Sequence, residues 1–202
     1  DEKLVIKKTY ENTQKINIVW EGLGNNIYQL NSLKSVLNKY SKKYEFTLNV
    51  VTDEYFYKYM NKFHRIKTIN LIKGLCENIK WHKWDTKTYS NILIKCDIAI
   101  IPIDQSRNFN MHKPENKLIF LWKMGLPVIT TETGSYKRVM DETGFKYYAS
   151  NEKKWLENLL ELSSSVDVRK KIGLECRAFA EKNYGDIVAI NRWNNLFNSV
   201  VP

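Results

Sequence analysis

Short apolar runs alternate along the chain with longer segments in which apolar residues recur at helical spacing. The runs are rich in β-branched residues and predict strands, at residues 16–20, 46–51, 79–84, 97–103, 127–131 and 145–149. The helical spacing is clearest between Leu30 and Tyr40, and it recurs at residues 86–96, 114–124 and 135–141 and from about residue 150 to the end. Residues 54–63 are also expected to be helical, with Asp53 as the N-cap, whereas residues 64–76 show no clear pattern.

This alternation predicts an α/β fold, a Rossmann-like parallel sheet with helices on both faces. The stretch Asp97–Ile103 is almost wholly apolar, which is typical of a central parallel strand that is buried on both faces. No internal repeat, linker-like stretch or composition break divides the chain. We therefore expect a single domain over residues 15–202, preceded by a linker or N-terminal extension over residues 1–14. A ligand site in such a domain lies at the carboxyl ends of the strands.

The charge of the chain narrows the classes of partner. Its 202 residues include 32 Lys and Arg against 22 Asp and Glu, a formal net charge of +10. Such an excess favours nucleic acid, phosphorylated small molecules or an anionic membrane surface, although lysines on solvated helix faces are the plainer explanation. The three cysteines are too scattered for a disulfide framework and favour a reducing cytosol. No apolar window is long enough to span a membrane, and the start at Asp1 suggests a fragment of a longer protein.

The stretch Asp97–Gly134 carries the most informative chemistry. A buried strand ends in Pro102 and a polar loop, and a helix then opens with Lys113 and Pro114. The free N–H groups and the dipole of a helix N-terminus favour phosphate, and two lysines would add full charges. The alternative is that these lysines are only solvated and that Asn116 caps the helix. The three histidines have no ligand spacing, so no metal site is expected.

The same stretch resembles the C-terminal, nucleotide-sugar-binding domain of GT-B glycosyltransferases of the group 1 (GT4-like) superfamily. The matching residues are Asp97, Ile98, Ile100, Pro102, Lys113, Asn116, Lys117, Leu118, Gly125, Pro127, Val128, Ile129 and Gly134. The turn Trp20–Gly22 is similar to the family's opening turn, and Trp155, Arg169–Gly173 and Arg192–Trp193 resemble its closing helices. The resemblance covers about residues 15–200 and implies one half of a GT-B fold.

Together, the helix start and the resemblance give eight candidate substrate-binding residues, while no catalytic residue can be assigned. They are Gly22, Gly24, Asp104, His112, Lys113, Glu115, Asn116 and Lys117. A nucleoside-diphosphate sugar would be the substrate, with no further cofactor and no metal. Many family members carry a pair of acids that hold the ribose and the donor sugar. Here His112 and Phe120 stand at those places, which puts both roles in doubt.

The resemblance implies sugar transfer to a glycan or lipid-linked acceptor, in bacterial surface polysaccharide synthesis. The acceptor would bind an N-terminal half that this chain lacks, so the chain alone is expected not to transfer sugar and to expose Trp20 and Tyr28 on the facing surface. The domain is expected in the cytoplasm, with peripheral contact to the inner face of the membrane. One alternative is a non-catalytic GT-B-like binding or assembly module. Another is a basic nucleic-acid-binding α/β domain, because aromatic residues interleaved with lysines, as in Tyr55–Tyr59, could stack on bases. Such aromatic residues are more often part of the core or of an interface.

Overall fold

The computed structural model describes residues 4–11, 14–59, 62–106 and 108–200. Six parallel strands form one sheet in the order β5-β2-β1-β6-β7-β8. The strands are β1 (Ile16–Glu21), β2 (Phe46–Thr52), β5 (Ile79–Lys83), β6 (Ile98–Ile101), β7 (Val128–Thr131) and β8 (Tyr148–Ala149). The predicted α/β fold with a parallel sheet is therefore confirmed.

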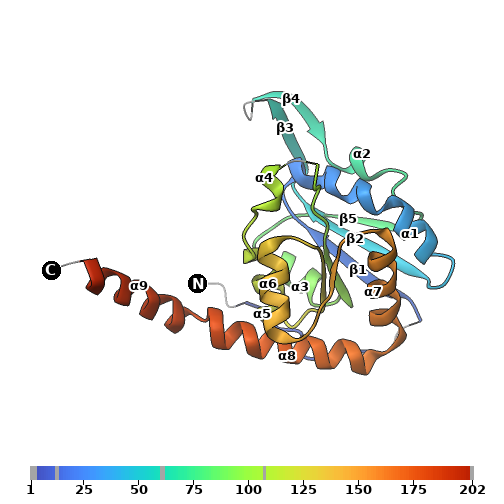
Figure 1. Cartoon of the computed structure of the whole chain (residues 1–202). Coiled ribbons are helices and arrows are strands. Elements are labelled where there is room, and N and C mark those ends of the chain that lie inside the picture. Colours follow the sequence, from blue (N-terminus) through green and yellow to red (C-terminus); the bar gives the residue numbers. More distant parts are fainter. Residues whose placement is uncertain (1–3, 12–13, 60–61, 107, 201–202) are drawn as a thin grey trace.

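Helices cover both faces of this sheet (Figure 1). Helices α1 (Lys34–Tyr40) and α7 (Glu152–Ser164) pack together on one face, while α5 (Asn116–Lys123) lies on the other and packs against α8 (Val166–Tyr184). The other helices are the 3₁₀ helix η1 (Gly24–Leu33), α2 (Ile69–Ile72), α3 (Tyr89–Leu93), α4 (Asn108–Met111), α6 (Gly134–Thr143) and α9 (Asp186–Val200). Within the described ranges, no helix has the length and apolar character needed to cross a membrane.

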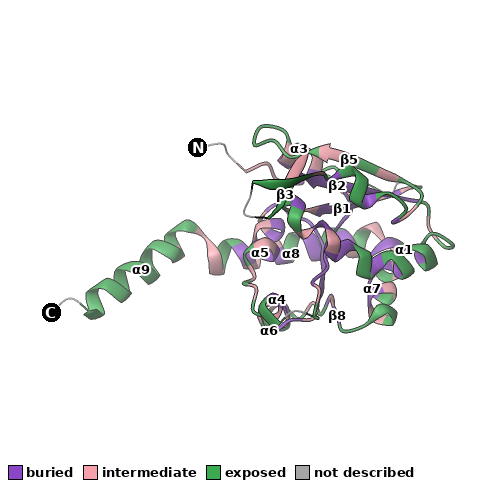
Figure 2. Ribbon diagram, turned by 90° about the horizontal axis from the view of Figure 1, so that it is seen from above, coloured by how far each residue is buried: buried purple, intermediate pink, exposed green. Residues whose placement is uncertain are grey.

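The hydrophobic core lies on the two faces of the sheet, as the distribution of buried residues in Figure 2 shows. Strands β2, β6 and β7 are buried along their whole lengths, as expected for central parallel strands. Trp20 is only 2 % exposed, so the prediction that it lies on an open surface is wrong. Its ring is covered by the ammonium group of Lys117, 5.6 Å from the ring centroid, while Tyr28 is half-buried.

Residues 54–63 do not form the predicted helix. Strands β3 (Tyr55–Tyr59) and β4 (Phe63–Lys67) pair antiparallel in a separate hairpin that projects from the carboxyl edge of the sheet (Figure 1). Aromatic residues are enriched in this segment, which suits a pleated strand better than a helix. Asp53 caps no helix, because its carboxylate instead accepts a hydrogen bond from the N–H of Gly24 at 2.9 Å.

Residues 4–11, which fall in the predicted N-terminal extension, pack on the amino edge of the domain. The backbone N–H of Lys7 donates to the carbonyl of Met124 at 2.8 Å, and the Tyr10 hydroxyl donates to the carbonyl of Gly125 at 2.5 Å. Residues 1–3 and 12–13 of that extension lie outside the described residues.

A buried charge network holds the same edge. The Lys7 ammonium donates to the carbonyls of Ile94 and Cys96 at 2.9 and 3.0 Å. The Asp97 carboxylate accepts the N–H of Asn17 at 2.8 Å and lies 3.9 Å from Nε of Arg169, which is 1 % exposed. These charges are committed to the fold.

Candidate functional site

At the carboxyl edge of the sheet, the loop after β1 meets the start of α5. The Lys117 ammonium donates to the backbone carbonyl of Glu21 at 2.6 Å and lies 3.5 Å from the Glu21 carboxylate. A Cβ atom on Gly22 would lie 3.0 Å from that ammonium nitrogen and equally close to the Trp20 ring. The structure thus brings together Gly22 and Lys117, which are 95 positions apart in the sequence.

Lys113 lies on the other side of the same junction. Its ammonium is 3.5 Å from the side-chain oxygen of Asn26, and the Gln29 amide, oriented to donate to the carbonyl of Pro102 at 2.6 Å, places its oxygen 2.9 Å from the same nitrogen. Partial burial lowers the pKa of Lys113, nearby Tyr28 and the Asp104 carboxylate raise it, and the positive charge of Lys117 lowers it. An anion bound here would relieve the repulsion between the two lysines.

Helix α5 adds backbone donors to these charges. Its first internal hydrogen bond runs from the N–H of Ile119 to the carbonyl of Glu115 at 3.0 Å, and no side chain caps the helix. The N–H groups that precede Ile119 therefore point out of the helix start with the positive end of its dipole. Asn116 occupies this first turn and is exposed.

Glu115 and Gly24 have partners within the fold. The Glu115 carboxylate accepts from Arg138 of α6 at 2.7 Å and from the Tyr184 hydroxyl of α8 at 3.5 Å, which ties α5 to both helices. The backbone N–H of Gly24 is taken by Asp53, and a Cβ atom at this position would lie 2.8 Å from Cγ2 of Thr68. Through these contacts Glu115 and Gly24 hold the elements around the site in place.

Asp104 follows β6 and lies at the mouth of a small cavity. Its carboxylate accepts the N–H of Ser106 at 3.0 Å, and its carbonyl accepts from the buried Asn110 amide at 2.9 Å. The adjoining cavity, about 210 Å³, reaches from Asp104 to Thr131 and Trp155 along the ends of β6, β7 and β8. A cavity of this size admits one ring of a ligand, because sites for whole drug-sized molecules start at about 300 Å³.

The two positions that match the family's acid pair, His112 and Phe120, differ in their surroundings. His112 is exposed at the site, whereas the Phe120 ring stacks on Tyr89 of α3 with the centroids 6.1 Å apart. Phe120 is thus part of an aromatic cluster between α5 and α3. The carboxylate nearest to Lys117 is Glu21, which sequence reasoning missed, as it missed Gln29. A carboxylate directly after the first strand was the available signal for Glu21.

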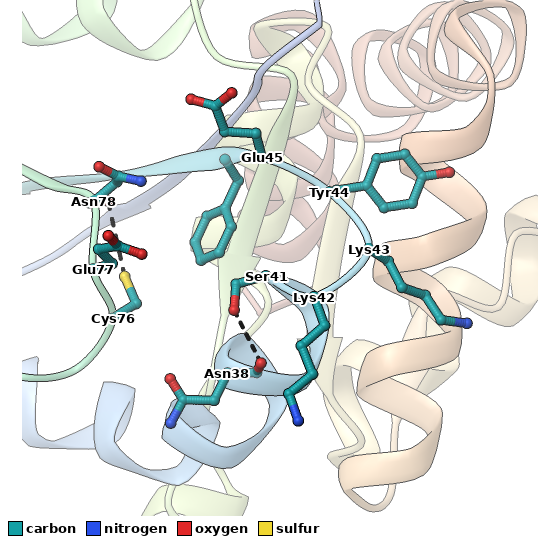
Figure 3. A pocket seen from close by; sticks show the side chains of 10 residues that line it. Asn38, Ser41, Lys42, Lys43, Tyr44, Glu45, Cys76, Glu77 and Asn78 are labelled. Atoms are coloured by element: carbon teal, nitrogen blue, oxygen red, sulfur yellow. Dashed lines mark hydrogen bonds between the residues drawn. The ribbon is translucent and has the colours of Figure 1, made fainter.

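A larger cavity of about 340 Å³ lies at the opposite, amino edge of the sheet (Figure 3). The thiol of Cys76 donates to the carbonyl of Asn78 inside it, and burial raises the pKa of this thiol to about 11. The side chains of Lys42 and Lys43 point away from each other, so no charges converge there. Among the described residues, no three His, Cys, Asp or Glu side chains are grouped so that they could hold a metal ion.

Comparison with solved structures identifies the fold. A glycosyltransferase from Rickettsia africae ESF-5 matches with a TM-score of 0.64 and 16% identity, over 94% of this chain and 48% of that one. Anabaena HepE, solved with UDP-glucose, matches with a TM-score of 0.58 and 16% identity, over 94% of this chain and 50% of that one. No protein-family model and no curated protein matches the sequence.

A third structure is itself an isolated domain. The C-terminal domain of a group 1 glycosyl transferase (LpcC) from Francisella tularensis matches with a TM-score of 0.54 and 16% identity, over 85% of this chain and 87% of that one. This chain therefore spans about half the length of the first two proteins and most of the third. The fold is that of the C-terminal half of a GT-B glycosyltransferase, as the sequence resemblance implied.

Proposed function

We propose that this domain binds a nucleoside-diphosphate sugar and serves as the donor half of a glycosyltransferase. The observation that carries the proposal is the meeting of Lys113, Lys117 and the uncapped start of α5 at the carboxyl edge of a GT-B-like sheet. Two ammonium groups and a helix N-terminus offer what a diphosphate needs. HepE, a protein with the same fold, was solved with UDP-glucose.

The chemistry asked of this half is electrostatic. When the sugar leaves, negative charge grows on the diphosphate, and fixed donors in place beforehand stabilise it without reorganisation. Lys113 and Lys117 supply the full charges, and the first turn of α5 supplies backbone N–H groups. The small cavity beside Asp104 offers room for one ring of the donor.

Transfer also requires an acceptor. We propose that it is a glycan or a lipid-linked glycan of bacterial surface polysaccharide synthesis. The two glycosyltransferase-fold proteins of which the match covers 48% and 50% are about twice as long as this chain. Positioning of two reactants supplies several kcal/mol of barrier reduction, roughly 7–11 kcal/mol at the upper end. We therefore expect the isolated chain to bind the donor and to transfer no sugar.

Calorimetry with UDP, GDP, the parent nucleosides and UDP-glucose tests donor binding. We expect at least one diphosphate to bind more tightly than its nucleoside, since the nucleoside forms no contact with the lysines. Lys170→Ala, at an exposed position of α8, is the matched control and should leave affinity unchanged. Equal affinity for nucleoside and diphosphate, or no binding of any of them, contradicts the proposal.

A specific observation also favours a second candidate, a non-catalytic GT-B-like binding or assembly module. Phe120 and His112 replace the acid pair, so the residues that would hold the ribose and donor sugar in the resembling family are absent from their usual places. A turnover assay on the full-length protein with nucleotide sugars and a lipid-linked acceptor extract separates the two. Transfer supports the enzyme, and diphosphate binding with no transfer supports the module.

A further inference from the structure

The β3–β4 hairpin (Tyr55–Tyr59 and Phe63–Lys67) projects from the domain at the same edge as the donor site (Figure 1). Its inner face is fixed to the body: Phe56 packs beside Gly24 of η1, so closely that a Cβ atom on that glycine would lie 3.2 Å from Cβ of Phe56. The backbone of Thr68 donates to the carbonyl of Glu54 at 3.1 Å and closes the base of the hairpin. The hairpin is thus held in place by its root, while Tyr59 and Phe63, at the far ends of its two strands, are exposed.

The outer face of the hairpin combines aromatic rings and cations. Tyr57 pairs with Arg65 and Tyr59 pairs with Phe63 across the two strands, and paired residues share a face. Near the base, the Arg65 guanidinium lies 3.8 Å from the Tyr55 ring centroid and closes that ring. Toward the tip, Tyr59 is 50 % and Phe63 58 % exposed, although the Lys58 ammonium and the His64 ring each lie 5.3 Å from the Tyr59 ring centroid. Aromatic surface therefore increases from root to tip.

The charge of the segment is one-sided. Residues 54–67 contain four Lys or Arg and one acid, Glu54, and that acid pairs with Lys83 of β5 at 3.6 Å. Over the described part of the chain, the four hairpin cations form no ion pair with a carboxylate. They are Lys58, Lys62, Arg65 and Lys67. A surface of this kind complements an anionic partner.

We propose that the hairpin tip docks on an anionic lipid surface. Aromatic side chains with one polar end settle at the boundary between headgroups and hydrocarbon, and flanking lysines contact anionic headgroups, which is the arrangement of this tip. A single-stranded nucleic acid fits less well, because it needs a row of open ring faces and the Tyr55 face is closed by Arg65. The argument for lipid binding uses only the residues of the hairpin. The purpose of this binding, which is to bring the donor site to a lipid-linked acceptor, rests on the proposed function.

Co-sedimentation of the whole chain with vesicles tests this surface. Vesicles of phosphatidylcholine with about a third of phosphatidylglycerol are compared with phosphatidylcholine alone. We expect binding to the anionic vesicles, weakened by salt, and at least about tenfold less to the neutral ones, since each cation near such a surface contributes about fivefold. Equal binding to both vesicles, or binding to neither, overturns the proposal.

Paired variants locate the contact. Tyr59→Ser with Phe63→Ser, and separately Lys58→Glu with Lys62→Glu, are each expected to weaken vesicle binding at least about tenfold, with an unchanged circular dichroism spectrum. The matched controls are Trp193→Ser with Phe197→Ser on α9, where both aromatics are exposed, and Lys170→Glu with Lys171→Glu on α8. Unchanged binding by the hairpin variants, or loss of binding in either control, overturns the proposal.

Two further measurements distinguish lipid docking from the proposed donor site and from nucleic-acid binding. The hairpin variants should bind UDP or GDP as the unmodified chain does, so a failed donor site with intact vesicle binding contradicts only the proposed function. The second measurement is competition between a single-stranded DNA oligonucleotide and anionic vesicles at equal charge concentration. If the oligonucleotide competes, and if the Tyr59→Ser, Phe63→Ser variant binds it more weakly, the hairpin binds nucleic acid instead and the lipid proposal is overturned.

Discussion

Lys7 and Lys113 lie at opposite edges of the same sheet, and burial lowers the pKa of both ammonium groups. Lys7 is 6 % exposed, donates to two carbonyls and lies near the Asp97 carboxylate, which raises its pKa in part. Lys113 has neutral amide oxygens as its hydrogen-bond contacts, while Tyr28 and the Asp104 carboxylate nearby raise its pKa and Lys117 lowers it. The amino edge thus buries its lysine almost completely in contacts of the fold, whereas the carboxyl edge leaves Lys113 partly exposed beside a second lysine, within reach of a ligand.

The comparison extends to the neighbours of each lysine. At the amino edge, Arg169 donates to the carbonyls of Leu162 and Glu11 at 2.8 and 3.2 Å, so its charge binds α7, α8 and the N-terminal segment together. At the carboxyl edge, the side chains of His112 and Asn116 are exposed. Charge that is already satisfied stabilises a fold, whereas charge that is held in place but incompletely satisfied can bind a ligand.

The largest effect is expected from Arg169→Leu. This substitution removes one of the two cations near the buried Asp97 carboxylate, Lys7 being the other, and it leaves the carbonyls of Leu162 and Glu11 without their donor. Removing one partner of a buried ion pair costs about 3–5 kcal/mol. Urea unfolding followed by circular dichroism measures the loss. Arg177→Leu, which removes an exposed helical ion pair with Glu181, is the control and should cost no more than about 0.5 kcal/mol. A small loss in the Arg169 variant would show that Lys7 and the N–H of Asn17 suffice to hold the Asp97 carboxylate at the amino edge.

A reciprocal pair of variants sharpens the contrast between the two edges. Lys113→Ala is expected to weaken nucleoside-diphosphate binding by about 1.5–3 kcal/mol, roughly tenfold to a hundredfold, with the midpoint of urea unfolding nearly unchanged. Lys7→Met is expected to do the reverse, because it leaves the carbonyls of Ile94 and Cys96 without their donor and is remote from the carboxyl edge. Calorimetry and urea unfolding on both proteins check this. Equal losses of affinity in the two variants would break the comparison.

The smallest effect concerns pH. Because burial lowers the pKa of Lys113 below the ordinary 10.5, this side chain loses its proton at a lower pH than an exposed lysine does. The neutral amine attracts a diphosphate less, so affinity should fall as pH rises through the lowered pKa, and binding at pH values around and above that pKa should take up protons. Lys113→Arg keeps its charge and should hold its affinity to higher pH. Titrations in buffers of different ionisation enthalpy measure the proton uptake, and identical pH profiles for both proteins would exclude Lys113 from the anion site.

The central strands were predictable from the sequence because they are buried on both faces and read as continuous apolar runs, as in Asp97–Ile103. The hairpin was not, because four of the five residues in Tyr55–Tyr59 are aromatic, so no apolar/polar alternation marks a buried face, and the inner face is set only when Phe56 meets Gly24 across 32 positions. The same long-range contact takes Asp53 away from the capping role that its local sequence favours.

For the candidate site, the sequence located Lys113 and Lys117 through the start of one helix, a local signal. It gave no sign of Gln29 and only the position of Glu21 at the end of the first strand, because the proximity of both residues to those lysines depends on the order in which the strands pair. The burial of Trp20 has the same origin, since Lys117, which lies over its ring, comes from α5, far along the chain.

Tyr10, Gly125 and Gly173 lie in close contact, and this contact determines when the domain can finish folding as it is synthesised. A Cβ atom on Gly173 would lie 2.5 Å from the carbonyl oxygen of Gly125, so α8 seats directly against the end of α5, and Arg169 fastens the N-terminal segment by the carbonyl of Glu11. All six strands leave the ribosome before this helix does, and until it emerges the apolar side of α5 is exposed to solvent or to a chaperone. Nascent chains arrested before Val166 should therefore be cleaved rapidly by protease, and chains released after Tyr184 should resist it as the whole domain does.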